Sequence, residues 1–122
     1  MLPFKEERTI EVTGRDLLSG LPKTFTISSM EIRDSIEEPV HAIISAIRRT
    51  LESTPPELSS DIFTNGITLT GGGALLNGLR AFVSTKMGIP VKISEDPLSC
   101  VALGTGKVLK KMDAYIDRII FN

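Results

Sequence analysis

Apolar and polar residues alternate near the N-terminus of the chain. Ile10 and Val12 alternate with threonines and a glutamate, and after a turn-rich stretch Phe25 and Ile27 alternate with threonines. A period of two is typical of β-strands that have one covered face and one face in water. The pattern therefore predicts a β-hairpin over residues 8–27 with one face on a core. The loop is longer than a two-residue turn, so the pattern leaves the strand register open.

A period close to 3.6 replaces this alternation after the hairpin. Ser28 and Glu31 have the spacing of a capping box, which satisfies free N–H groups at the start of a helix. The residues that recur at steps of three and four are Ile32, Ile36, Val40, Ile43, Ile44, Ile47 and Leu51. This stripe predicts a long amphipathic helix. Pro39 lies inside it and is expected to kink or split the helix.

Strands and helices alternate in the second half of the chain. The patterns predict a short helix over 57–63, a strand over 67–70, a helix over 74–87, a strand over 90–93, and a last helix from 97 to about 115. This order predicts an α/β layer that the hairpin precedes in the chain. We expect three parts: a hairpin over 1–28, an α/β core over 29–115, and an apolar C-terminal tail over 116–122.

Composition narrows the classes of function. The 122 residues are 41% hydrophobic and 24% charged, as in an ordinary globular domain, and the net charge is −1. Without a basic excess, a nucleic acid partner is not expected. No apolar run reaches the ~18 residues that a membrane span needs. One cysteine and one histidine cannot form a Cys/His zinc site, and a single cysteine fits a reducing cytoplasm.

Three consecutive glycines, residues 71–73, follow the strand predicted at 67–70. Because glycine has no Cβ, backbone N–H groups there can approach a phosphate or a sugar, and a following helix would add its positive dipole end. The Walker loop does not fit, since Lys-Ser/Thr does not follow Gly78, and the Rossmann fingerprint fails at Leu76. The residues alone leave open a nucleotide-binding turn or a tight strand-to-helix turn without a ligand.

A second group of small residues lies in the last predicted helix. Ala102, Gly104 and Gly106 make this helix thin along part of its length. A glycine inside a helix costs about 1 kcal/mol relative to alanine, so it normally serves a packing contact. Close crossing by another element is the first interpretation, and contact with a nucleotide is the second.

Both glycine-containing segments resemble motifs of one protein family. Residues 70–79 resemble the adenosine motif of the actin/Hsp70/sugar-kinase superfamily, and residues 95–106 resemble its second connecting motif. In detail these segments, together with residues 14–24 and 54–58, are similar to the MreB/Mbl family of bacterial actin homologues, which determine rod shape. Four separated motifs in the right order are far more specific than three glycines alone.

The resemblance implies a fold and a function. The fold is the α/β core of the second large lobe of an actin-like ATPase, a ribonuclease H-like layer, with the hairpin from its smaller subdomain. Family members bind ATP and Mg²⁺ between two lobes, form filaments, and lie in the cytoplasm at the inner face of the cell membrane. The implied nucleotide-binding residues are Gly71, Gly72, Gly73, Ala74 and Leu75, with Asn77 a weaker candidate. The residues implied for the interlobe helix are Ala102, Gly104 and Gly106.

The resemblance also implies that most of the active site has no counterpart in this chain. The two phosphate loops, the water-positioning residue, the Mg²⁺-linked acid and the adenine-contacting segment of the family are not matched. We therefore expect no catalytic or metal-ligating residue here, weak or absent ATP binding, and no ATP hydrolysis by this chain alone. The alternative is a non-enzymatic module that associates with itself or with a full-length filament protein, and reaches the membrane only through it. A sugar-kinase lobe is a third interpretation, which residues 54–57 and the hairpin argue against.

Overall fold

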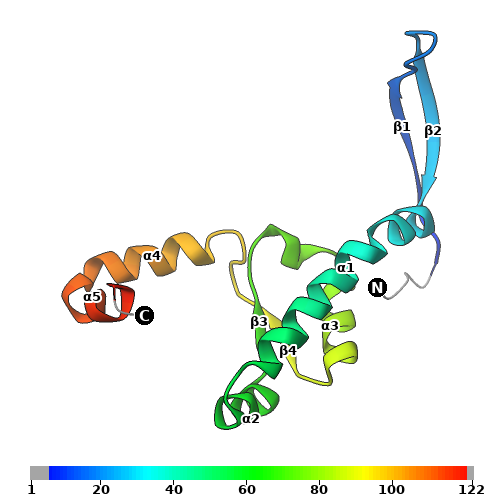
Figure 1. Ribbon diagram of the computed structural model, residues 1–122. Helices are drawn as coiled ribbons and strands as arrows, with labels where there is room; N and C mark the ends of the chain where they lie inside the picture. The colour runs from blue at the N-terminus through cyan, green and yellow to red at the C-terminus, as the bar shows by residue number, and fades with distance from the viewer. Residues whose placement is uncertain (1–5, 121–122) are drawn as a thin grey trace. The chain divides into compact units, whose positions relative to one another are not determined.

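Backbone contacts divide the chain into two units, Met1–Ser59 and Ser60–Asn122. The computed structural model describes residues 6–120, and the side chains of residues 6–116 (Figure 1). The finer division into 1–28, 29–115 and 116–122 stays a prediction, and the side chains of most of the tail lie outside the described residues. Within the described residues, no helix is both long and apolar enough to cross a membrane.

The first unit begins with an antiparallel hairpin. Its strands are β1 (Thr9–Arg15) and β2 (Pro22–Ser28), which confirms the hairpin prediction (Figure 1). The register places Val12 opposite Phe25 and runs the full length of both strands. The six-residue connection between the strands closes with a hydrogen bond from Asp16 N–H to the carbonyl oxygen of Leu21, at 2.9 Å.

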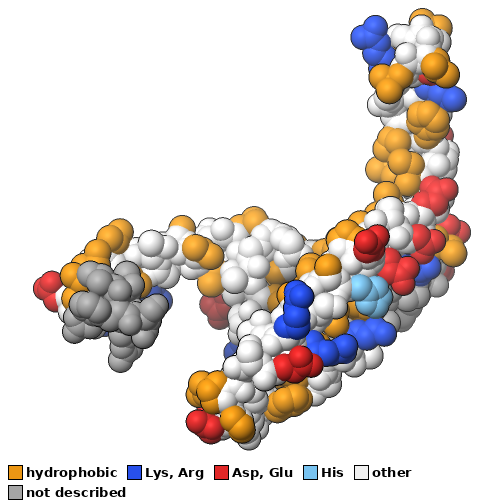
Figure 2. All heavy atoms as spheres, in the orientation of Figure 1, with side chains coloured by type: hydrophobic (Ala, Val, Ile, Leu, Met, Phe, Trp, Pro, Cys, Tyr) orange, Lys and Arg blue, Asp and Glu red, His pale blue; other side chains and the backbone are white. Residues whose placement is uncertain are grey.

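One face of the hairpin is apolar, and most of it is exposed in the described structure. Cross-strand partners share a face, so Ile10, Val12, Phe25 and Ile27 lie on the same side of the sheet. Ile10 is 63% exposed and Phe25 is 47% exposed, and hydrophobic side chains follow the hairpin surface (Figure 2). The expectation of a core under this face is wrong. Alternation shows which residues share a face, whereas burial requires a second element to cover that face.

The hairpin loop depends on one carboxylate. Leu18 N–H donates to Asp16 Oδ1 at 2.9 Å, and Gly20 N–H donates to the carbonyl oxygen of Asp16 at 2.7 Å. The hydrogen bond from Leu18, with smaller help from Ser19, lowers the pKa of the Asp16 carboxyl below its ordinary value of 3.8. The ionised carboxylate therefore favours the ordered loop.

We expect acid to loosen this loop. Because the folded pKa of Asp16 is lowered, its contribution is complete above the unfolded pKa and is lost as the pH falls through the lower folded value. NMR titration of the Asp16 carboxyl carbon, with amide exchange at Leu18, measures this. Asp16→Asn keeps an acceptor without a titrating group, so it should remove the pH dependence. A carboxyl that titrates at or above 3.8 in the folded chain contradicts the prediction.

A long helix follows, α1 (Ser29–Glu52). Glu31 N–H donates to Ser28 Oγ at 3.1 Å, and Ser28 N–H donates to Glu31 Oε2 at 3.2 Å, so the capping box is confirmed. The helix runs through Pro39 without a break, so of the two outcomes expected there the split does not occur and the kink stays a prediction. Proline removes one N–H donor, while the remaining turns of a 24-residue helix keep theirs.

The second unit contains a strand–helix–strand crossover. After α2 (Pro56–Asn65), β3 (Ile67–Leu69) pairs in parallel with β4 (Val91–Ile93), and α3 (Leu79–Met87) connects them (Figure 1). Gly88 ends α3 in the left-handed conformation, with φ of 66°, as expected for a helix C-cap. The buried residues of α3, β4 and the segment between them are Leu79, Phe82, Val83, Ile89 and Val91. The α/β layer is confirmed in a small, partial form.

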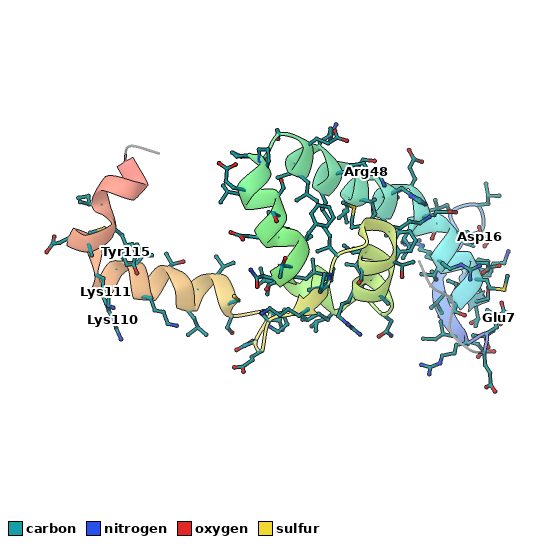
Figure 3. The ribbon with its side chains drawn as sticks, turned by 90° about the horizontal axis from the view of Figure 1, so that it is seen from below. Glu7, Asp16, Arg48, Lys110, Lys111 and Tyr115 are labelled. Carbon is teal, nitrogen blue, oxygen red and sulfur yellow. The ribbon has the colours of Figure 1, made fainter. Side chains whose placement is uncertain are left out.

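Two helices occupy the region predicted as one. They are α4 (Cys100–Lys110) and α5 (Met112–Ile120), and Lys111 separates them (Figure 1). Lys110, Lys111 and Tyr115 lie around their junction (Figure 3). The helix also begins at Cys100 rather than at residue 97, because residues 97–99 form a turn first. No residue of α4 is buried.

Candidate nucleotide-binding site

The three glycines lead into a single short helical turn. This turn is the 3₁₀ helix η1 (Gly72–Leu75), and α3 begins only at Leu79. The prediction of a helix that starts at Ala74 is therefore wrong. The expected helix dipole at the glycines is wrong as well, because a single four-residue turn has only a small dipole. Leu76 is extended, and Gly78 is left-handed with φ of 82°, which together interrupt the helix.

The glycine turn lies at the carboxyl edge of the parallel strand pair. It follows β3, and residues 94–97 follow β4 at the same edge. Gly71 N–H donates to the carbonyl oxygen of Pro97 at 2.7 Å, and Thr70 Oγ1 donates to the same oxygen at 3.2 Å. Ligands of open α/β sheets bind outside the carboxyl ends of the strands. The turn therefore lies where sheets of this class bind their ligands.

The turn is open on its outer side. Gly71 has φ of 86°, a left-handed conformation that favours glycine. Gly72 and Gly73 are both exposed. A Cβ added at Gly71 or Gly73 would meet no atom within 4 Å beyond the adjacent residues, and at Gly72 it would meet only Leu98 Cδ2, at 3.3 Å. Backbone N–H groups at the start of a helical turn have no carbonyl acceptor within that turn. Among residues 6–120, the structure shows no acceptor for the N–H groups of Gly72 and Gly73.

The other residues implied for the site are divided between the surface and the interior. Leu75 is 53% exposed and Asn77 is exposed, so both are accessible beside the glycines. Ala74 is 5% exposed and its side chain is part of the core, which leaves only its backbone for a ligand. Contact of any of these residues with a nucleotide stays a prediction.

The charged side chains at the carboxyl edge of β3 and β4 do not attract a phosphate. Residues 67–77 carry no charged side chain, and residues 93–99 carry only Glu95 and Asp96. One oxygen of Asp96, Oδ1, accepts a hydrogen bond from Ser99 N–H at 3.3 Å and so orders the start of the turn before α4. In the part of the chain that the structure describes, no group of three or more His, Cys, Asp and Glu side chains could hold a metal ion.

Sequence reasoning missed the support behind the glycine turn. The carbonyl oxygen of Pro97 anchors the turn from 26 residues away, and Leu98 limits the space at Gly72. The strand–helix–strand order predicted over 67–93 was the signal that could have found the contact between the two loops. Such a crossover makes the two strands parallel and places the loops that follow them at one edge of the sheet.

The small residues of α4 do not line a close helix crossing in the described chain. A Cβ at Gly104 or Gly106 would meet no atom within 4 Å, and Ala102 is exposed. The packing contact expected from the sequence is therefore not found within residues 6–120. Their place in an interlobe helix stays a prediction.

Comparisons with known proteins agree on one family. The sequence model described as "MreB/Mbl protein" matches residues 1–117. The chain is 45% identical over 118 residues to the cell shape-determining protein Mbl of Bacillus subtilis (strain 168), covering 97% of this chain and 35% of that protein. It is 50% identical over 113 residues to the cell shape-determining protein MreB of Escherichia coli (strain K12), covering 93% of this chain and 33% of that protein.

Solved structures of MreB5 from Spiroplasma citri are similar in fold. The structure bound to ADP has a TM-score of 0.84 at 40% identity, over 95% of this chain and 35% of that chain. The structure bound to AMPPNP has a TM-score of 0.83 at 39% identity, over 98% of this chain and 36% of that chain. The chain spans about a third of the length of these relatives. It belongs to the MreB/Mbl family, and it corresponds to a third of an actin-like cell shape protein.

Proposed function

We propose that this chain supplies one wall of the ATP pocket in an MreB-type filament protein. The observation that carries the proposal is the open glycine turn, residues 71–73, at the carboxyl edge of β3 and β4. Two solved relatives of similar fold are bound to ADP and AMPPNP, which supports a nucleotide as the ligand. The filament protein would act in the cytoplasm, at the inner face of the cell membrane.

The chemistry of the turn suits a wall rather than a complete pocket. Its N–H groups and the exposed Leu75 side chain offer hydrogen bonds and apolar contact to the sugar and the adjoining phosphate. Nothing charged in residues 67–77 neutralises a triphosphate, and Glu95 and Asp96 at the same edge repel it in the absence of Mg²⁺. We expect weak binding, with a Kd on the order of 1 mM, which corresponds to about 4 kcal/mol.

Magnesium ATP should shift the backbone amide signals of Gly72 and Gly73 in an NMR titration of the 122-residue chain. Gly73→Glu should weaken the binding about tenfold or more, because it places a carboxylate where the phosphate would lie. The substitution fits without strain, since a Cβ at Gly73 meets nothing within 4 Å and its φ is not positive.

Ser60→Glu is the matched control for this substitution. It adds the same charge at an exposed position of α2, which precedes β3, whereas the glycine turn follows the carboxyl end of that strand. Binding should survive in this variant. Unchanged glycine amide signals at about 10 mM ATP, or equal binding by the Gly73→Glu chain, contradict the proposed site.

A second candidate function is association without nucleotide. On α4, Val101 is 70% exposed, Leu103 is 59% exposed and Leu109 is 64% exposed. Exposed large apolar side chains on a helix that has no buried residue are available for contacts with another protein. The partner would be a second copy of the chain or a full-length filament protein, and any membrane contact would be made through that protein. A mass that rises with concentration, without ATP-dependent amide shifts, favours this function over nucleotide binding.

A further inference from the structure

Among residues 6–120, no strand lies beside the backbone groups at the outer edge of β1. Asp16 N–H donates to the carbonyl oxygen of Leu21 beyond one end of the strand. Ser29 N–H donates to the carbonyl oxygen of Arg8 beyond the other end. Both bonds continue the β1–β2 register, so the even-numbered residues of β1 are the ones hydrogen-bonded to β2.

The odd-numbered residues of β1 therefore point their N–H and C=O groups away from β2. These residues are Thr9, Glu11, Thr13 and Arg15. In the part of the chain that the structure describes, the sheet holds only β1 and β2, so no third strand pairs with this edge. Two strands alone are marginally stable, and an unblocked edge is a template for another strand.

The two edges of the hairpin differ in chemistry. The side chains of Glu11 and Arg15 bring opposite charges to β1, four residues apart on one face. On β2, the one charged side chain is Lys23, and Pro22 has no N–H to donate. When two copies of a strand lie antiparallel, only β1 can therefore place opposite charges against each other.

We propose that β1 pairs in antiparallel fashion with β1 of a second copy of this chain. A two-fold axis at Thr13 places Glu11 of each copy opposite Arg15 of the other, which forms two ion pairs across the strands. In this register odd-numbered residues face odd-numbered residues, so the outward N–H and C=O groups of both edges meet. Opposite charges directly across a sheet stabilise pairing, and like charges oppose it.

The pairing produces a four-stranded sheet from two hairpins. The apolar faces, each made by Ile10, Val12, Phe25 and Ile27, then lie side by side on one surface. Three or more strands with an apolar face reach independent stability, which two strands lack. This proposal rests on the association function of the chain and not on its binding of a nucleotide.

Charge exchange between the two positions tests the pairing. In sedimentation equilibrium of the 122-residue chain, Glu11→Lys alone and Arg15→Glu alone should each raise the dimer Kd about tenfold or more, since each variant pairs like charges twice. An equal mixture of the two variants should restore association. In the mixed dimer the introduced lysine faces the introduced glutamate, and the native Arg15 faces the native Glu11.

Controls separate this pairing from other causes. Glu38→Lys makes the same charge change at an exposed position of α1 and should leave the dimer Kd unchanged. Slower amide exchange at Glu11, Thr13 and Arg15 as concentration rises should accompany dimer formation. Arg15→Glu also removes the hydrogen bond from Arg15 Nε to the carbonyl oxygen of Gly20, so recovery in the mixture is the decisive result.

Three results overturn the proposal. They are a chain that stays monomeric at all concentrations, a dimer that neither single substitution weakens, and a mixture that fails to restore association. ATP-induced shifts of the Gly72 and Gly73 signals in the Glu11→Lys chain report on the nucleotide site separately. A failure of the pairing therefore remains distinguishable from a failure of the proposed nucleotide site.

Discussion

Replacing Gly66 with alanine should strongly destabilise the second unit. Gly66 has φ of 88°, and a Cβ there would lie 2.3 Å from the carbonyl oxygen of Pro90 and 3.0 Å from its carbon. A left-handed conformation costs an L-residue roughly 1–2 kcal/mol before any overlap is counted. The overlap also pushes away the carbonyl that accepts from Ile67 N–H at 2.9 Å, which is the hydrogen bond that starts the β3–β4 pairing.

The expected loss is more than about 3 kcal/mol, against the roughly 5–15 kcal/mol that holds a whole domain together. Urea denaturation followed by circular dichroism measures it, with amide exchange at residues 67–69 as the local signal. Gly104→Ala is the matched control, because that glycine lies in α4 with no atom within 4 Å of an added Cβ and no positive φ. Alanine there should stabilise the helix by about 0.5–1 kcal/mol. Equal urea midpoints for the two variants contradict the close approach of Gly66 to Pro90.

Elements whose signals are local were predictable from the sequence. The capping box of Ser28 and Glu31, the stop at Gly88 and the alternation in the two hairpin strands each depend on a few neighbouring residues. The break between η1 and α3 was not predictable in this way. The apolar spacing from Leu75 to Leu79 is the same for a continuous helix and for an interrupted one, and the extended Leu76 with the left-handed Gly78 separates them.

Features that depend on distant segments were less accessible. The sequence identified the glycine turn and its family, but not its anchor, since the bond from Gly71 to Pro97 joins loops 26 residues apart. The apolar face of the hairpin is a second feature that depends on a distant segment. Its alternation is correct, yet Ile10 and Phe25 are exposed, because the cover that alternation implies has to come from another element.

The chain alone should leave ATP intact. In a phosphate-release assay with Mg²⁺, we expect a rate equal to that of the Gly72→Glu chain, which serves as the background. The Cβ of a glutamate at Gly72 would meet only the movable end of Leu98, so this variant should fold while its carboxylate blocks the glycine turn. Phosphoryl transfer needs in-line positioning and neutralisation of the charge that develops on the transferred group.

The carboxyl edge of β3 and β4 meets neither need. Its N–H groups at Gly72 and Gly73 would reach only one side of a bound nucleotide, and the two charged side chains nearby in sequence, Glu95 and Asp96, have the same sign of charge as the phosphates. Loss of a single cationic group from a phosphoryl-transfer site lowers its rate by about a thousandfold or more, and here such groups are missing from both loops of the edge. Release of phosphate above the Gly72→Glu background would therefore require catalytic groups elsewhere in the chain, and it would contradict the one-wall pocket.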